Sequence, residues 1–130
     1  MGTIKTICIL TLLTFSLTNC SQTRNDRAII GRSGAEQELK STLADMSKDN
    51  FLEGKRIIIK DSVTAISVAE PILFSIYGKD NIIKQRPYET FLIDKYWIIN
   101  GTLPIDYLGG TFLIIIDSQD SKIIKIFHGK

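Results

Sequence analysis

Residues 96–110 constrain the fold most, because they contain both the end of one strand and the crossing to another. The stretch holds the only Trp of the chain, Trp97, followed by an Asn-Gly step, a Pro and a Gly pair. Asn, Gly and Pro favour turns through their backbone geometry. We therefore expect a strand over residues 96–100 and a stiff, aromatic-bearing loop that leads to a further strand.

Short apolar runs rich in β-branched residues surround this stretch and are typical of strands. Two runs are separated only by Asp94 and Lys95, which indicates a tight hairpin. Residues 80–85 predict a loop, and the polar cluster at 117–121 lacks Gly and predicts a longer connection than a two-residue turn. Consecutive strands with such short links pair antiparallel. The runs expected as strands are residues 56–60, 87–93, 96–100, 111–116 and 122–128.

One long amphipathic helix is expected over residues 63–77, where apolar residues recur at a spacing of 3.6. Asp61 can cap its first turn, and Gly78 follows its end, where a left-handed residue is favoured. Pro71 lies in its middle and predicts a kink or an irregular first part. A short N-terminal strand and one helix packed on about four antiparallel strands define an α+β domain over residues 54–130.

The amino-terminal residues have the composition of a bacterial leader peptide. Lys5 supplies a positive charge, and residues 7–17 are apolar but shorter than the roughly 20 residues that cross a bilayer. Leu-Thr-Asn-Cys at 17–20 resembles the lipobox of lipoproteins, in which Cys20 would be diacylated. We expect residues 1–19 to be a signal peptide and the protein to be lipid-anchored to a membrane of the cell envelope, facing the periplasm or the surface. A plain secretory signal or a membrane tether is the alternative.

Residues 20–53 are mostly polar and predict a lipid-anchored linker. Within this linker, Leu39, Leu43 and Met46 recur at helical spacing, so residues 35–46 have the pattern of a short helix. Such a helix is marginal alone, because isolated helices of this length are unstable in water.

Composition and motifs argue against several function classes. The 16 Lys+Arg and 14 Asp+Glu give a net charge of +2, which is too balanced for nucleic-acid binding. The single His, His128, has no nucleophile or orienting partner in the sequence, and no His or Cys pairs have metal-ligand spacing. We therefore expect no catalytic residue, no metal and no cofactor.

Glu70 supports an alternative function. It lies near the apolar face of the expected helix, where it could act as a base in a pocket between helix and sheet. The protein would then be an envelope small-ligand-binding or hydrolase/isomerase-like protein. This hypothesis requires a deep polar pocket, and a solid apolar core at that place would exclude it.

Aromatic residues near the loop predict a surface that binds a partner. Tyr96 and Trp97 are adjacent in a strand and point to opposite faces, so one of them is expected in the core. The other, with Tyr107, would form an aromatic patch of the kind enriched at interface hot spots. The residues expected to contact a partner are Trp97, Asn100, Thr102 and Tyr107.

Several motifs follow one another in the second half of the chain: Ala69-Glu70-Pro71-Ile72-Leu73-Phe74, Ile76-Tyr77-Gly78-Lys79, Gln85-Arg86-Pro87-Tyr88, Tyr96-Trp97-Ile98-Ile99-Asn100-Gly101-Thr102-Leu103-Pro104, Gly109-Gly110 and Lys122-Ile123-Ile124-Lys125-Ile126-Phe127-His128-Gly129-Lys130. In order and approximate spacing, residues 61–130 resemble the immunity proteins with a nuclear-transport-factor-2-like fold from bacterial polymorphic toxin systems. Ser121 stands where the family commonly has Gly, and the lipoprotein-like leader is an addition. The resemblance implies an α+β cone and a non-enzymatic role, the binding and neutralisation of a cognate toxin.

Overall fold

The computed structural model describes residues 27–130. The chain divides into two compact units between Leu39 and Lys40. Helix α1 (Gly31–Ala44) crosses this boundary, and none of its residues is buried. A short helix is predicted for residues 35–46, and α1 overlaps this range but starts at Gly31 and ends at Ala44. The predicted signal peptide and Cys20 lie outside the described residues.

Four strands of the second unit form one antiparallel sheet in the order β1-β2-β3-β4. Asp94 and Lys95 join β1 to β2 as the hairpin pattern predicts, and Asp94 has a φ of 54°. Ser121, in the turn before β4, has a φ of 61°, a conformation that Gly adopts at lower cost. The strands are β1 (Glu89–Ile93), β2 (Tyr96–Asn100), β3 (Phe112–Asp117) and β4 (Ile123–His128).

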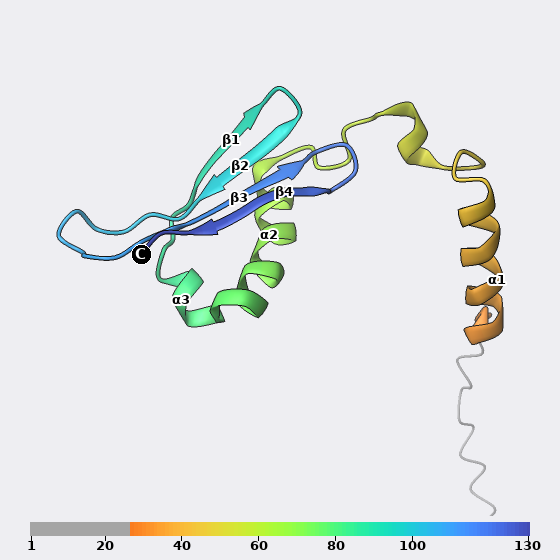
Figure 1. The fold of residues 1–130 in the computed structure, drawn as a ribbon, viewed down its shortest axis with the longest axis horizontal. Helices are drawn as coiled ribbons and strands as arrows, with labels where there is room; N and C mark the ends of the chain where they lie inside the picture. The colour runs from red at the N-terminus through yellow and green to blue at the C-terminus, as the bar shows by residue number, and fades with distance from the viewer. Residues whose placement is uncertain (1–26) are drawn as a thin grey trace, which may run out of the picture. The chain divides into compact units, whose positions relative to one another are not determined.

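Helix α2 (Ser62–Tyr77) lies on one face of this sheet (Figure 1). The Asp61 carboxylate accepts a hydrogen bond from the Thr64 amide at 2.8 Å and so caps the first turn, as expected. The helix continues through Pro71, and its first part is regular. It ends at Gly78, whose φ of 85° turns the chain directly into a short further helix, α3 (Lys79–Ile83).

The hydrophobic core fills the space between α2 and the sheet. Ala65, Ala69 and Leu73 recur every fourth residue on α2 and are each 0% exposed. Burial of a large apolar side chain contributes about 1.5–3 kcal/mol to stability. Together with the sheet order, this confirms the predicted α+β class with one long helix on four antiparallel strands. The sheet residues that meet α2 are Trp97, Ile99, Phe112, Ile114 and Ile116.

Two predicted segments differ in the structure. Residues 56–60 are not a strand, because the amides of Ile58 and Ile59 both donate to the Ser118 carbonyl, at 2.8 and 3.0 Å. Because two consecutive amides share one acceptor, the chain bends at this point and cannot form the regular hydrogen-bond pattern of a β-strand. Residues 80–85 are not a loop: most of them belong to α3, where the 0% exposed Ile82 joins the core.

Candidate interaction site

The connection between β2 and β3, residues 101–111, extends beyond the ends of the strands (Figure 1). Its tip, residues 104–108, carries apolar side chains that contact little of the protein. Ile105 and Leu108 are each 101% exposed, and Tyr107 is 66% exposed. Single exposed apolar residues are ordinary, but an exposed group on one ordered loop is typical of a binding surface.

The base of this loop is held by hydrogen bonds to several elements. The Gly101 amide donates to the Phe112 carbonyl at 2.9 Å. Thr102 donates twice, from its amide to the Gln85 carbonyl at 2.9 Å and from its hydroxyl to the Pro87 carbonyl at 2.6 Å. Within the tip, the Tyr107 amide donates to the Pro104 carbonyl at 2.9 Å. The tip is therefore a turn on an anchored base.

Gln85 connects the loop base to the rest of the unit, a role that no pattern in the sequence predicts. Its side chain is buried, and its Oε1 accepts from the Phe112 amide at 2.9 Å. Its Nε2 donates to the Asn81 carbonyl at 3.0 Å and lies 3.2 Å from His128 Nε2. Because the Gln85 amide donates there, His128 Nε2 is the acceptor, and its Nδ1–H donates to the Gly129 carbonyl at 2.7 Å.

The structure separates the residues that were expected to contact a partner. Trp97 lies in the core and not on the surface, since it is 6% exposed and its Nε1 donates to the Ile59 carbonyl at 2.9 Å. Asn100 and Thr102 are half-buried at the loop base, and Asn100 Nδ2 donates to the Gly101 carbonyl at 2.9 Å. Tyr107 alone of the four lies in the exposed tip.

Glu70 is held by partners at the flank of the helix. Its Oε1 accepts from Arg86 Nε at 2.9 Å, from Arg86 Nη2, and from the Tyr88 hydroxyl at 2.8 Å. The bond to Glu70 raises the pKa of Arg86, while burial and then the bond to Glu70 raise the pKa of Tyr88. A hollow beside this cluster is lined by Ile66, Arg86, Pro87 and Tyr88.

This arrangement does not suit a general base. Three donors, Arg86 Nε, Arg86 Nη2 and the Tyr88 hydroxyl, already occupy one oxygen of Glu70, so this oxygen is not free to take a proton from a substrate. Across the described part of the chain, the buried residues between α2 and the sheet form an apolar cluster, which is the packing that argues against the alternative function.

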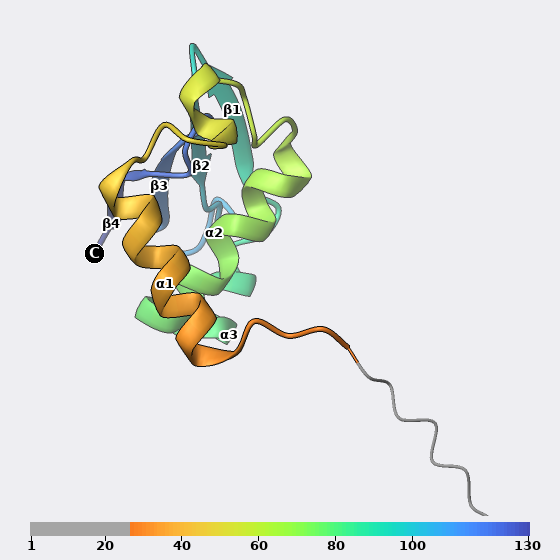
Figure 2. The ribbon, with the colours of Figure 1, turned by 90° about the vertical axis from the view of Figure 1, so that its right-hand side faces the viewer.

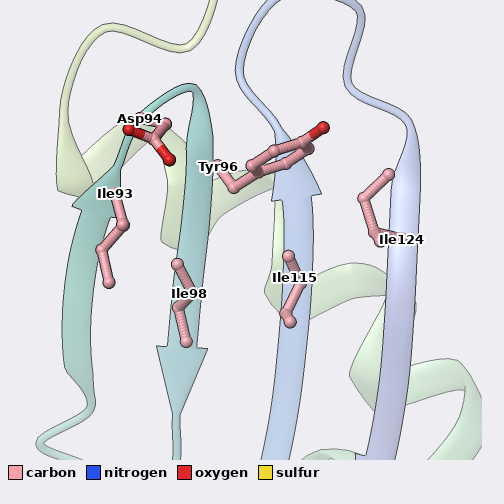
Figure 3. Close-up of a pocket in the computed structure, with 6 residues that line it drawn as sticks. All are labelled: Ile93, Asp94, Tyr96, Ile98, Ile115 and Ile124. Carbon is pink, nitrogen blue, oxygen red and sulfur yellow. The ribbon is translucent and has the colours of Figure 1, made fainter.

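The sheet face opposite α2 is also apolar, and we call it the outer face. A hollow of about 280 Å³ on it is lined by isoleucines of all four strands and by the Tyr96 ring, with Asp94 at its rim (Figure 3). Beside it, Lys95 Nζ lies 2.6 Å from Asp117 Oδ2. This ion pair lowers the pKa of Asp117 and raises that of Lys95. The isoleucines of the hollow are Ile93, Ile98, Ile115 and Ile124.

A model of the NTF2 fold immunity protein family, Imm-NTF2-2, matches residues 64–130. The chain belongs to this family. The resemblance found in the sequence is thereby confirmed, and the matched region includes the anchored loop, Gln85 and the outer face.

Two proteins of Escherichia coli (strain K12) are similar to the chain. Uncharacterized protein YhhH is 34% identical over 82 residues, which are 60% of this chain and 65% of YhhH. Uncharacterized protein YbbC is 27% identical over 73 residues, 55% of this chain and 60% of YbbC. The alignments thus span less than two thirds of either relative. No solved structure matches the chain.

Residues 27–130 contain the helices α1, α2 and α3. None of their helices has the length and apolar character needed to cross a membrane. In the same residues, no three His, Cys, Asp or Glu side chains are grouped so that they could hold a metal ion.

Proposed function

We propose that this member of the immunity protein family binds one cognate bacterial toxin domain and neutralises it without catalysis, using the loop tip as its anchor. The observation that carries the proposal is the full exposure of Ile105 and Leu108 on a loop with a fixed base. Family membership supports the role, and the geometry supports the surface.

The anchored base matters for affinity. Ordering a flexible loop on binding costs about 0.5–1.5 kcal/mol for each immobilised side chain, whereas a loop held in place avoids part of that cost. Complete burial of Ile105 and Leu108 in a partner would contribute about 1.5–3 kcal/mol each. A projecting apolar tip fits a concave apolar pocket, so the toxin surface should be hollowed where the tip enters.

The test begins with a toxin identified by its activity. Residues 22–130 are used to capture partners, each partner is expressed alone, and a genuine target stops growth unless the wild-type chain is co-expressed. The double variant Ile105→Asp/Leu108→Asp should then weaken toxin binding at least about 100-fold, because two buried apolar anchors become charged. Growth protection should be lost, and calorimetry should measure the change in Kd.

The matched control is Val63→Asp/Ile76→Asp, which places the same charges at exposed aliphatic positions of α2. Its Kd should stay within about twofold of wild type, and circular dichroism should show both double variants folded. Full protection by the loop variant would remove the tip from the interface. If no captured protein stops growth in a way that the wild-type chain relieves, the proposed toxin-neutralising function is wrong.

We also propose that the protein acts at the cell envelope, held by lipid on Cys20. The support is the leader pattern that ends at that residue. Cys20→Ala should move the protein from the membrane fraction to the soluble fraction, measured by fractionation and immunoblotting. Cys8→Ala, within the leader, is the control and should leave it in the membrane. Membrane retention of Cys20→Ala would show that the leader is not a lipobox.

A further inference from the structure

The free side of β1 presents main-chain groups that no neighbouring strand uses. β1 is one edge of the sheet and β4 is the other (Figures 1 and 2). Main-chain direction alternates along a strand, and the Gly101 amide, directly after β2, donates to the Phe112 carbonyl of β3. Odd-numbered residues of β2 therefore bond to β3, and even-numbered ones bond to odd-numbered residues of β1. The amides and carbonyls of Thr90 and Leu92 consequently point away from the sheet, and among residues 27–130 they have no hydrogen-bond partner.

The β1 edge lacks the features that normally keep edge strands from pairing. Natural proteins protect such edges with Lys, with Pro or with a bulge. β4 has Lys125 in its middle and a shift of register in its pairing with β3. β1 has a continuous register and contains no Lys or Pro, and its Phe91, Leu92 and Ile93 are all exposed. Of the two edges, β1 is therefore the one that is open to a further strand.

Acidic side chains stand at both ends of β1. Glu89 begins the strand, Asp94 directly follows it, and both are exposed. If a second copy paired antiparallel through β1, Glu89 of each copy would lie near Asp94 of the other, and parallel pairing would place each acid near its equivalent. Like charges so placed disfavour the pairing of two copies. The complementary partner is an extended segment with Lys or Arg at its ends and apolar residues between them.

The open edge leads to the base of the loop. The Thr102 hydroxyl at this base donates to the carbonyl of Pro87, which lies just before β1. Glu89 pairs with Asn100, the last residue before the loop. A strand along β1 therefore ends beside the loop base. Stable complexes use about 20–30 residues a side, so a partner that binds residues 104–108 needs further contacts nearby.

We infer that the toxin adds one of its extended segments to β1 as a further strand of the sheet, while another part of it receives the loop tip. This inference rests on the toxin-binding function proposed above. Strand addition supplies affinity through main-chain hydrogen bonds, here to Thr90 and Leu92, and specificity through alternate side chains. The side chains of the added strand should be apolar beside Phe91 and Ile93 and basic at both ends of the strand.

Amide hydrogen exchange tests the inference with the toxin that the growth assay identifies. Residues 22–130 are used, since they include every buried apolar residue of the described core. In the free protein the amides of Thr90 and Leu92 should exchange fast, and in the toxin complex both should slow at least about tenfold. The Ile126 amide, which points away from the sheet at the β4 edge, is the control and should keep its free rate.

The outcomes separate this inference from the function on which it rests. A neutralised toxin in whose complex Thr90 and Leu92 exchange as in the free protein overturns the added strand and leaves the proposed function intact. If no captured protein stops growth in a way that the chain relieves, the proposed function fails and the added strand falls with it.

Removal of one outward amide provides a second test. Leu92→Pro deletes the amide and places a ring where the added strand would lie, whereas Leu92→Ala shortens the side chain and keeps the amide. Pro is tolerated where an edge amide faces solvent, and circular dichroism should show both variants folded. Leu92→Pro should bind the toxin at least about tenfold more weakly than Leu92→Ala, because one hydrogen bond is lost and an acceptor of the toxin is left unpaired. Thr90→Pro and Thr90→Ala should differ in the same way. Equal Kd values within both pairs would contradict strand addition.

Charge removal tests the acidic ends of the edge. Glu89→Gln/Asp94→Asn should raise the toxin Kd about tenfold at low salt, because two attractions to basic side chains are lost. The matched control is Glu53→Gln/Asp49→Asn, which changes the same residue types outside the sheet. Asp49 and Asp94 also share a positive φ, of 53° and 54°. The control should keep its Kd within about twofold of wild type. Equal binding by the two double variants would show that the proposed charge complementarity is wrong.

Discussion

Gly110→Ala is expected to destabilise the protein severely. A Cβ atom at this position would lie 2.0 Å from the carbonyl carbon of Gly129 and 2.1 Å from its carbonyl oxygen. Both are backbone atoms, so the start of β3 and the end of β4 must separate, although the Gly129 amide donates to the Thr111 carbonyl there at 2.9 Å. Overpacking of this kind costs about 3 kcal/mol. The melting temperature should fall by about 12–24 °C in thermal unfolding by circular dichroism.

Two other glycines give a graded control for this substitution. At Gly54 the nearest atom to an added Cβ is Arg56 Nε at 3.3 Å, the end of a flexible side chain that can move away. Gly54→Ala should therefore change the melting temperature by only a few degrees. In Gly129→Ala the added Cβ would lie 3.1 Å from Gly110 Cα, so its loss of melting temperature should lie between those of the other two variants. If Gly110→Ala and Gly54→Ala lowered the melting temperature equally, the close approach of the two strand ends would not be needed for stability.

The elements that local pattern determines were predicted correctly. The spacing of Ala65, Ala69 and Leu73 specifies a helix with one apolar face, and Asp61 and Gly78 mark its ends. The strands follow from apolar runs separated by short polar breaks, which leave room only for antiparallel neighbours. None of these inferences needs a contact between distant parts of the chain.

The errors arise where a distant contact decides the structure. Alternation places Tyr96 and Trp97 on opposite faces, but which face is inside depends on where α2 packs, and α2 covers the side of Trp97. Residues 56–60 have the composition of a strand, yet Ser118 supplies only one carbonyl to them. Gln85 looks like a polar residue of a loop, and its burial becomes evident only when Phe112 and His128 lie beside it.

The prediction for Gln85 follows from these distant contacts. Gln85→Leu keeps a similar volume but removes the acceptor of the Phe112 amide and the donor to the Asn81 carbonyl and His128. A buried donor left without a partner costs about 1–3 kcal/mol, and loss of the remaining bonds adds to this. The free energy of unfolding should fall by about 3 kcal/mol in urea titration.

Amide hydrogen exchange separates this explanation from a general loss of packing. The Phe112 amide should exchange much faster in Gln85→Leu than in wild type, whereas the amide of Ile99, inside the sheet, should change only by the factor set by global stability. Gln119→Leu removes a single bond, to the Lys55 carbonyl near the surface, and should alter the free energy of unfolding by no more than about 0.5 kcal/mol. Unchanged protection of Phe112 would mean that Gln85 does not hold the base of the loop. The anchored loop that we propose as the toxin-binding element would then need another support.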